Sequence, residues 1–223
     1  IDADVLAIQE VDFLQPRSQN VKMVEEIAKT CGYPHWAFAP ALEGTPGSHW
    51  VPSEKLRTNS NQIDLPTSYG VGMLSRIPVK NWQRISLKKS PIGLPLAITS
   101  PKGTRIAYVK DEPRVGLAAE LENGISIISG HLSFVPPVNT FQLRQIKKWA
   151  SRFQMRKIFL GDLNPLLFGT AGLKSVNTAK SYPSWAPKVK FDYIFSDDLV
   201  CEELELPFTG VSDHMPLGIE VSL

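Results

Sequence analysis

The stretch Gly161-Asp162-Leu163-Asn164, directly after the apolar run Ile158–Leu160, decides the fold that this sequence predicts. A second stretch, Ser212-Asp213-His214, lies near the end of the chain. Each places acidic, amide or imidazole groups where a buried strand is expected to give way to a loop. Such strand ends are where α/β sheets hold ligands and catalytic groups.

The same pattern recurs at three further segments: Gln9-Glu10 after Val5–Ile8, Gly130-His131 after Ile125–Ile128, and Asp192 within Phe191–Phe195. Each segment alone also fits an ordinary strand end or a Gly/Asp/Asn turn. Together, they supply carboxylates, an amide and two imidazoles. That combination can bind a hard divalent cation and split a phosphate ester.

The bulk composition sets few limits on function. Hydrophobic residues make up 43% and charged residues 21% of the 223 residues, and the formal net charge is +2. These values are ordinary for a globular chain that buries a core, and they neither require nor exclude a polyanionic partner. Two cysteines are too few for a disulfide framework, and the helical spacing of Cys31 predicts a buried free thiol. No apolar stretch approaches transmembrane length, so we predict a cytoplasmic protein with one domain over residues 1–223.

The periodicity predicts more strands than helices. One amphipathic helix is expected over Asn20–Cys31, with Gly32 as its stop, and another from Asn139, where Asn139 and Gln142 fit a capping box. The strands expected besides Val5–Ile8 are Tyr69–Leu74, Val115–Leu121, Ile125–Leu132, Lys157–Leu160, Phe191–Phe195 and Pro216–Val221. The polar stretch Ala41–Ser68 is expected to be a long loop that shapes a substrate cleft, and Ser86–Pro113 to be loops around short strands. This balance favours two packed sheets with outer helices over a simple doubly wound sheet.

Taken jointly and in order, the five motifs resemble those of the endonuclease/exonuclease/phosphatase superfamily, and the resemblance runs from about Asp4 to the end of the chain. That group includes deoxyribonuclease-I-like nucleases, abasic-site endonucleases, neutral sphingomyelinases and inositol-polyphosphate phosphatases. The resemblance implies a four-layered α/β sandwich of two mixed β-sheets flanked by helices, with the site at one edge. It is specific for the superfamily but does not select a substrate.

The resemblance also implies roles for individual residues. Glu10 would hold Mg²⁺ or Mn²⁺, and Asp213 would lie close to the metal or its waters. Asp162 and Asn164 would orient or activate the attacking water and the phosphate, while His131 would hydrogen-bond a phosphate oxygen. Asp192 and His214 would complete the catalytic set.

Asp192 lies in an aromatic, β-branched run, where an unpaired carboxylate is costly to bury. We therefore predict that Asp192 accepts a hydrogen bond from a ring nitrogen of His214. This bond would fix the imidazole and raise its pKa, and an imidazolium can stabilise charge at phosphorus.

Members of the superfamily begin with a strand that ends in an Asn of the metal site. That strand would precede Ile1, so we expect this chain to lack it. The function that fits best is a metal-dependent phosphodiesterase, with a nuclease first because His131 resembles the phosphate-binding His of deoxyribonuclease-like and sphingomyelinase-like members. A phospholipid or small phosphoester hydrolase comes second, and a noncatalytic binding module that retains the fold comes third. The basic stretch Arg144–Arg152 would offer contacts to a nucleic-acid backbone or form a solvated surface.

Overall fold

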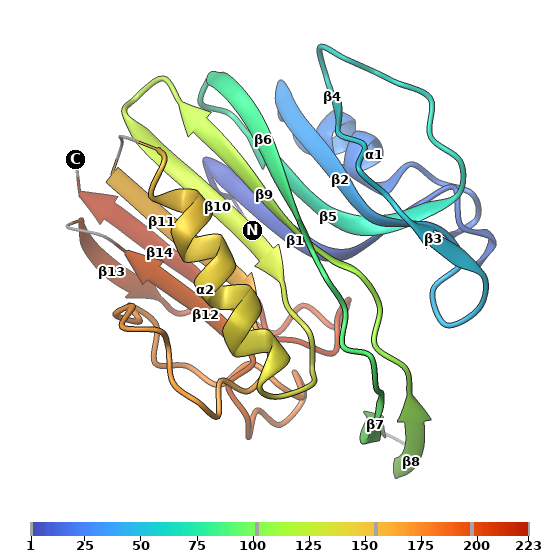
Figure 1. Cartoon of the computed structure of the whole chain (residues 1–223). Helices are drawn as coiled ribbons and strands as arrows, with labels where there is room; N and C mark the ends of the chain where they lie inside the picture. The colour runs from blue at the N-terminus through green and yellow to red at the C-terminus, as the bar shows by residue number, and fades with distance from the viewer. Residues whose placement is uncertain (1, 101–102, 154–155, 197–198, 223) are drawn as a thin grey trace.

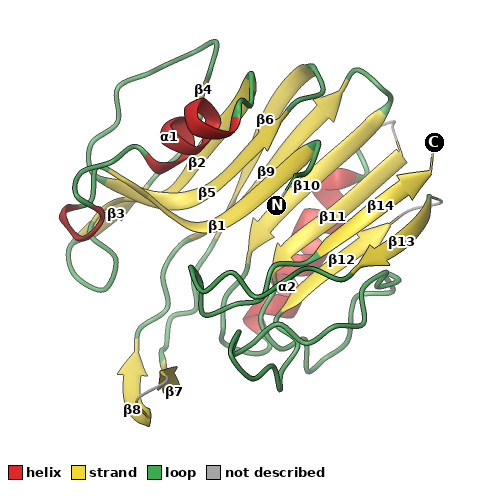
Figure 2. Cartoon of the chain, turned by 180° about the vertical axis from the view of Figure 1, so that it is seen from behind, coloured by secondary structure: helices red, strands yellow, loops and turns green. Residues whose placement is uncertain are grey.

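The computed structural model describes residues 2–100, 103–153, 156–196 and 199–222, and its strands build two five-stranded sheets and two separate two-stranded hairpins. The first sheet contains, in sequence order, β1 (Val5–Phe13), β2 (His35–Gly44), β3 (Trp50–Pro52), β4 (Arg57–Thr58) and β5 (Ser68–Ser75). The second contains β6 (Val79–Leu87), β9 (Arg114–Leu121), β10 (Ile125–His131), β11 (Arg156–Asp162) and β12 (Asp192–Ser196). Helix α1 (Met23–Cys31) lies on one outer side of the molecule and α2 (Val138–Ala150) on the other, with a short 3₁₀ turn at Pro16–Ser18 (Figures 1 and 2).

Three apolar clusters explain this arrangement. The largest lies between the sheets, where Ala37 and Met73 of the first sheet meet Leu117 and Ile127 of the second. A second cluster lies under α2, and the third packs α1 against the first sheet. Each large side chain buried in these clusters stabilises the fold by roughly 1.5–3 kcal/mol. The molecule is thus a mixed α/β fold with several sheets and few helices.

Only one of the two large sheets is mixed, whereas the resemblance implied two. In the second sheet, α2 connects β10 to β11, and this crossover makes the two strands a parallel pair. In the first sheet, all described pairings are antiparallel, because β5 lies between β1 and β2 and runs opposite to both.

The stretch from Ala41 to Ser68 is not a continuous loop. Strand β2 runs on to Gly44, and β3 and β4 fold back onto it. The polar composition is compatible with strands because the polar side chains find partners. The guanidinium of buried Arg57 donates hydrogen bonds to Glu25 and to the carbonyl of Ile63. Strand pairing and satisfied hydrogen bonds therefore outweigh the loop-like composition.

Details at both helices also differ from expectation. Helix α1 begins at Met23, and Cys31 at its last position is exposed rather than buried. Helix α2 begins at Val138 without a capping box. The side chain of Asn139 donates to the carbonyl of Pro165, and that of Gln142 accepts from the backbone N–H of Ser133, so both residues tie the helix to neighbouring loops instead.

The two hairpins are β7 (Leu94–Ser100) with β8 (Gly103–Val109), and β13 (Val200–Leu204) with β14 (Gly218–Ser222). Strand β14 lies against the core, to which Ile219 and Val221 contribute. The β7–β8 hairpin, in contrast, extends away from the sheets (Figures 1 and 2).

Candidate active site

Three of the sequence-predicted residues lie side by side at one end of the second sheet, where three adjacent strands begin or end. His131 ends β10 and is the register partner of Asp162, which ends β11. Asp162 is in turn the partner of Asp192, the first residue of β12. Strand pairing alone therefore brings together a His and two Asp from segments far apart in the sequence.

The glycine that precedes Asp162 is required for a steric reason. Gly130 and Gly161 are register partners, and a Cβ on Gly161 would lie 2.0 Å from the carbonyl oxygen of Gly130. Gly161 also has a φ of +142°, which side chains other than hydrogen disfavour. Only glycine at position 161 allows the two strands to approach in this way.

Glu10 reaches the same edge from the first sheet, although it does not end its strand. Strand β1 continues to Phe13, and a register shift between Ile8 and Val11 marks a bulge. Glu10 has a φ of +57° within that bulge. Its Oε1 lies 3.9 Å from Nε2 of His131, and its carboxylate is largely exposed. A non-glycine residue in the left-handed region is uncommon and is found preferentially at functional sites.

Asp162 is buried at the centre of the group. Its Oδ1 accepts a hydrogen bond from the backbone N–H of Asn164 at 3.0 Å. The Asn164 side chain in turn donates to the carbonyl of Leu132 at 3.0 Å. Burial and the charge of Asp192 raise the pKa of Asp162 to about 7. Asp162 therefore either keeps its proton or, when ionised, requires a cation nearby.

His214 completes the row from the C-terminal loop. Its Nδ1–H donates to Oδ2 of Asp192 at 2.7 Å, which confirms the predicted hydrogen bond. Its Nε2 lies 4.0 Å from Oδ2 of Asp162. Burial alone would lower the pKa of His214, but the hydrogen bond and charge of Asp192, helped by Asp162, raise it to about 9. The imidazole is therefore protonated at neutral pH.

A second loop holds His214 in place. The rings of Tyr182 and Phe191 pack against the imidazole, with centroids 5.2 and 5.7 Å away. The backbone N–H of Ser184 donates to the carbonyl of Asp213, and the N–H of Met215 donates to the carbonyl of Ser181. These contacts on both sides of His214 fix its position.

Arg114 is a site residue that the sequence patterns did not reveal. It is buried at the start of β9, and its Nη1 lies 2.8 Å from Nε2 of His131. Its Nη2 donates to the fully buried carboxylate of Asp111 at 3.3 Å. Burial, followed by the charges of Arg114 and His214, lowers the pKa of His131 well below its ordinary value. His131 is therefore neutral, unlike His214.

The structure brings most of the expected residues together, with one exception. Asp162, Asp192 and His214 offer potential metal-ligand atoms that lie within 4.8 Å of one another. Glu10 and Asn164 contact this group through His131 and Asp162. Asp213 is exposed, and its carboxylate stands outside the three-residue group.

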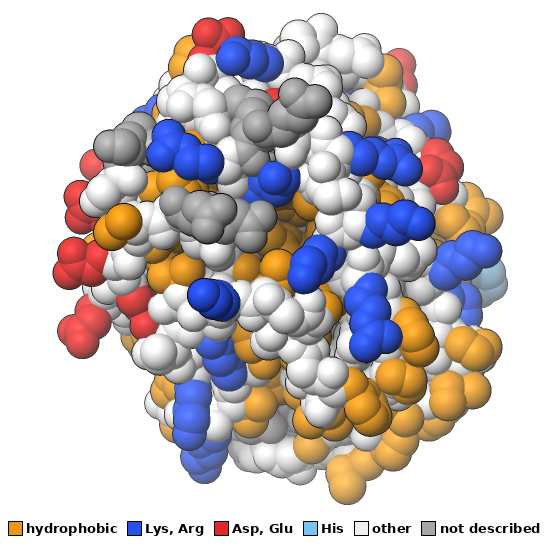
Figure 3. All heavy atoms as spheres, turned by 60° about the vertical axis from the view of Figure 1, so that its left-hand side comes forward, with side chains coloured by type: hydrophobic (Ala, Val, Ile, Leu, Met, Phe, Trp, Pro, Cys, Tyr) orange, Lys and Arg blue, Asp and Glu red, His pale blue; other side chains and the backbone are white. Residues whose placement is uncertain are grey.

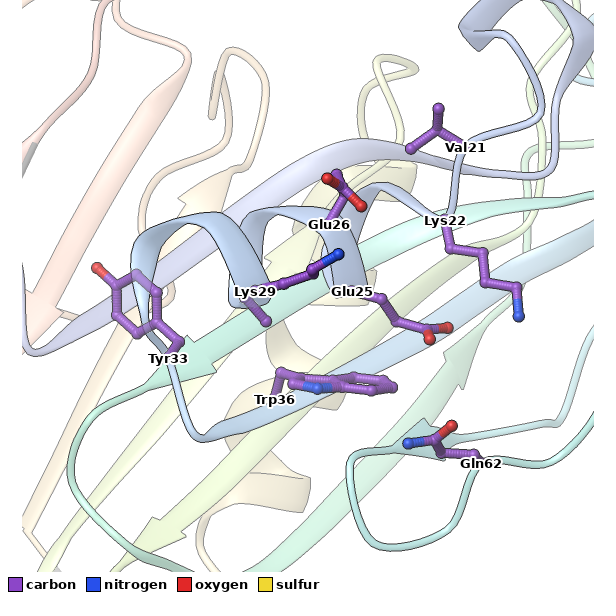
Figure 4. A pocket seen from close by; sticks show the side chains of 9 residues that line it. Val21, Lys22, Glu25, Glu26, Lys29, Tyr33, Trp36 and Gln62 are labelled. Atoms are coloured by element: carbon purple, nitrogen blue, oxygen red, sulfur yellow. The ribbon is translucent and has the colours of Figure 1, made fainter.

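A hollow elsewhere on the surface is not part of this site. It has a volume of about 540 Å³ and lies along α1, lined by Glu25, Glu26, Lys22 and Lys29 among others (Figure 4). The acidic and basic side chains there balance one another, and none of its lining residues belongs to the group around Asp162.

The profile of the Endonuclease/Exonuclease/phosphatase family matches residues 1–214. The chain belongs to the Endonuclease/Exonuclease/phosphatase family. Family members hydrolyse phosphoesters and include nucleases and phosphatases. No curated protein matches the sequence.

Solved structures share the fold of this family member at low sequence identity. An endonuclease/exonuclease/phosphatase from Beutenbergia cavernae DSM 12333 superposes with a TM-score of 0.57 at 18% identity, covering 98% of this chain and 61% of that chain. The human Nocturnin catalytic domain with bound sulfate gives 0.53 at 15%, covering 98% and 81%. A Staphylococcus aureus beta toxin mutant with bound magnesium ions gives 0.53 at 15%, covering 97% and 86%. This chain thus spans 61% of the length of the Beutenbergia protein, and the likeness is one of fold.

Proposed function

We propose that this protein is a divalent-metal-dependent phosphodiesterase that cleaves its substrate by attack of water. One observation carries the proposal: Oδ2 of Asp162 lies between two imidazoles, 3.8 Å from Nε2 of His131 and 4.0 Å from Nε2 of His214. His131 is neutral and His214 is protonated, so the buried Asp162 carboxylate has an uncharged imidazole on one side and a cationic one on the other. Such a contrast between neighbouring groups is typical of acid–base assignments in active sites.

The side chains fit a hard divalent cation. The buried carboxylate of Asp162 faces the charges of Asp192 and Glu10, both of which raise its pKa. A cation beside Asp162 would relieve this repulsion. We propose that Glu10 and Asp213 hold Mg²⁺ or Mn²⁺, because these ions prefer carboxylate oxygens and water. The bound ion would neutralise the phosphate and lower the pKa of a coordinated water.

The protein's own groups then take distinct roles. His131, which is neutral and held by Arg114, hydrogen-bonds a phosphate oxygen. His214 carries a proton that stabilises the charge developing at phosphorus, and Asp192 keeps the imidazole in that state. Asp162 and Asn164 orient the attacking water. Groups of this kind each contribute typically about 10²–10⁴-fold to the rate.

Nucleic acid is the first substrate class to test. Charged side chains on the face shown in Figure 3 are mainly Lys and Arg, with Asp and Glu towards its rim. Four basic residues of α2 and its C-terminal end are exposed: Arg144, Lys147, Lys148 and Arg152. A basic surface of this kind supplies contacts to a phosphate backbone.

A second candidate is the hydrolysis of a phospholipid headgroup ester. The exposed apolar side chains of the projecting β7–β8 hairpin favour it, since such surfaces mark interaction sites. A noncatalytic binding module ranks third, because the chemistry-bearing side chains are retained and most of them converge.

A substrate panel tests the proposal. Duplex DNA, single-stranded DNA, RNA, sphingomyelin and an inositol phosphate are each incubated with Mg²⁺ or Mn²⁺ and the protein, its Asp162→Asn variant or an Asp64→Asn control. Asp64 is exposed and lies outside the group, so the control matches the charge change alone. We expect hydrolysis of at least one substrate, at least about 100-fold lower in Asp162→Asn and abolished by chelation. Full activity after exhaustive chelation would overturn the metal-dependent mechanism, and a folded protein inactive on the whole panel would support the binding module.

A further inference from the structure

The β7–β8 hairpin exposes apolar side chains without a partner in the part of the chain that the structure describes. Its two strands pair only with each other. Ile106 is 79% exposed and Tyr108 is 64% exposed. A two-stranded hairpin is marginally stable in water by itself, so a projecting one with bare apolar residues points to a binding surface.

Both faces of the hairpin are apolar. On one face, Ile106 and Tyr108 lie opposite Ala97 and Pro95. On the other face, Leu96 lies opposite Ala107, and the exposed Ile98 lies opposite Arg105. A protein partner that docked on one face would leave the other in water, whereas lipid covers both faces at once.

All charged residues of the segment that contains the hairpin are basic. From Leu87 to Lys110 the sequence contains five cations and no acidic residue: Lys88, Lys89, Lys102, Arg105 and Lys110. The first acidic residues after this segment, Asp111 and Glu112, lie at the base of the hairpin, and both carboxylates accept hydrogen bonds. Asp111 accepts from the N–H of Ser90, and Glu112 accepts from the N–H of Gly47. The hairpin and its base therefore carry net positive charge in the sequence, and Arg105 lies among the apolar residues of β8.

We propose that the β7–β8 hairpin is an anchor that inserts into the surface of an anionic lipid bilayer. Its apolar side chains enter the boundary between headgroups and acyl chains, while Arg105 and the Lys residues at its base contact anionic headgroups. Tyr108 lies near the base of the hairpin, where its hydroxyl accepts from the N–H of Gly93, and aromatic rings favour the interface between lipid and water. The proposal does not depend on the proposed hydrolysis.

The anchor would face the same way as the candidate active site. Strand β9 begins directly after the hairpin, and its residue Val115 is the register partner of His131. In Figure 1 the hairpin extends beyond the end of the sheet at which β10 ends. A bilayer that holds the hairpin would therefore lie on the side of the molecule where His131 stands.

Vesicle co-sedimentation tests the anchor. The whole chain is mixed with vesicles of phosphatidylcholine and phosphatidylserine, or of phosphatidylcholine alone, at physiological salt. We expect binding to the anionic vesicles, weakened at least about tenfold without phosphatidylserine. Ile106→Asp is expected to weaken binding at least about tenfold, because it replaces an inserted side chain by an anion. Val200→Asp changes a side chain that is 75% exposed on β13, and this control is expected to bind like the unmodified chain.

The anchor would be overturned by no binding of the unmodified chain to anionic vesicles, by equal binding of Ile106→Asp, or by an equal loss of binding in Val200→Asp. A dimer that Ile106→Asp converts to a monomer, with no vesicle binding, would assign the hairpin to a second copy of the chain and also overturn the anchor. Hydrolysis of the water-soluble bis(p-nitrophenyl) phosphate, measured in parallel, is expected to be unchanged in Ile106→Asp. Vesicle binding without any hydrolysis would leave the anchor standing and count against the proposed function alone.

Discussion

Nδ1 of His214 lies 2.7 Å from Oδ2 of Asp192, and the same imidazole approaches Oδ2 of Asp162 at 4.0 Å through Nε2. Replacing Asp192 by Asn keeps the shape but removes the charge that holds the His214 pKa near 9. We expect the His214 pKa to fall, since burial is then opposed only by the charges of Asp162 and Asp213. Turnover should fall, and the alkaline limb of its pH profile should move to lower pH.

NMR titration of the imidazole in the metal-free protein measures this shift, with the His214→Ala spectrum to assign the signal. Asp213→Asn is the control, because Asp213 is exposed and is the weakest of the acidic neighbours that raise this pKa. An unchanged His214 pKa in Asp192→Asn would remove the dyad from the mechanism.

Removing the His214 imidazole should affect turnover far more than folding. We expect His214→Ala to lower kcat by roughly 10²–10⁴-fold. The side chain is only partly buried at the edge of the fold, so the melting temperature should change by no more than a few degrees. His49→Ala, at an exposed loop position, provides the matched control. A folded His214→Ala protein with nearly unchanged turnover would exclude the proposed role.

Asp162 makes the metal-free protein less stable as the pH rises. Its folded pKa of about 7 exceeds the ordinary value of 3.8, so the folded state keeps a proton that the unfolded state releases. Stability should therefore fall between about pH 4 and pH 7, and the Asp162→Asn variant should show a flatter pH dependence. Asp64→Asn should follow the unmodified chain.

Added Mg²⁺ should reverse this loss at pH 8. At about a hundredfold excess over its dissociation constant, we expect a rise in melting temperature of roughly 5–10 °C. Thermal unfolding with and without a chelator measures both effects. The same pH dependence in Asp162→Asn would contradict the raised pKa of Asp162, and no response to Mg²⁺ and Mn²⁺ would contradict a cation beside it.

Gly161→Ala should disrupt the edge of the sheet that carries the site. The new Cβ would lie 2.0 Å from a backbone oxygen that cannot move without breaking the β10–β11 pairing. We expect a loss of more than ~2 kcal/mol beyond Gly124→Ala, which also has a positive φ but open space around it. Urea unfolding measures the difference, and equal effects of the two substitutions would show that the close approach is not limiting.

Arg114 and Asp111 form a buried pair whose halves depend on each other. Removing the cation in Arg114→Met leaves a buried carboxylate, which typically costs about 3–5 kcal/mol. Adding Asp111→Asn should recover part of that loss, because the amide carries no charge to bury. If the double variant loses more unfolding free energy than the two single variants lose together, the pair is not what holds this region together.

The positions of His131 and Asp162 at strand ends follow from the sequence because each lies where an apolar run meets polar residues, whereas Asp192, expected within the strand Phe191–Phe195, is the first residue of β12. Glu10 shows the limit of that reading. The apolar pattern resumes at Val11, and nothing local announces the bulge that keeps β1 continuous to Phe13. The two-residue polar interruption therefore predicts a strand end where the structure has a bulge.

Arg114 shows a different limit. It is the first residue of an otherwise ordinary apolar strand, and its contact with His131 arises only from the register that sets Val115 opposite His131. Register between segments is a tertiary property, so no local pattern in the sequence could have singled out this arginine. Its contact with His131 is what distinguishes it from Arg57, which is also buried and paired with an acid.

The carboxylate of Asp111 joins the base of the projecting hairpin to His131. It accepts from the N–H of Ser90 before β7 and from the hydroxyl of Ser133 after β10, and it pairs with Arg114, whose other nitrogen contacts His131. The two regions therefore share one buried charge, and a shift of the hairpin that displaced Asp111 would change the support of the imidazole. Thermodynamic linkage would make such a coupling reciprocal: if occupancy of the hairpin changed ligand affinity at His131, the ligand would change the affinity of the hairpin for its partner by the same factor.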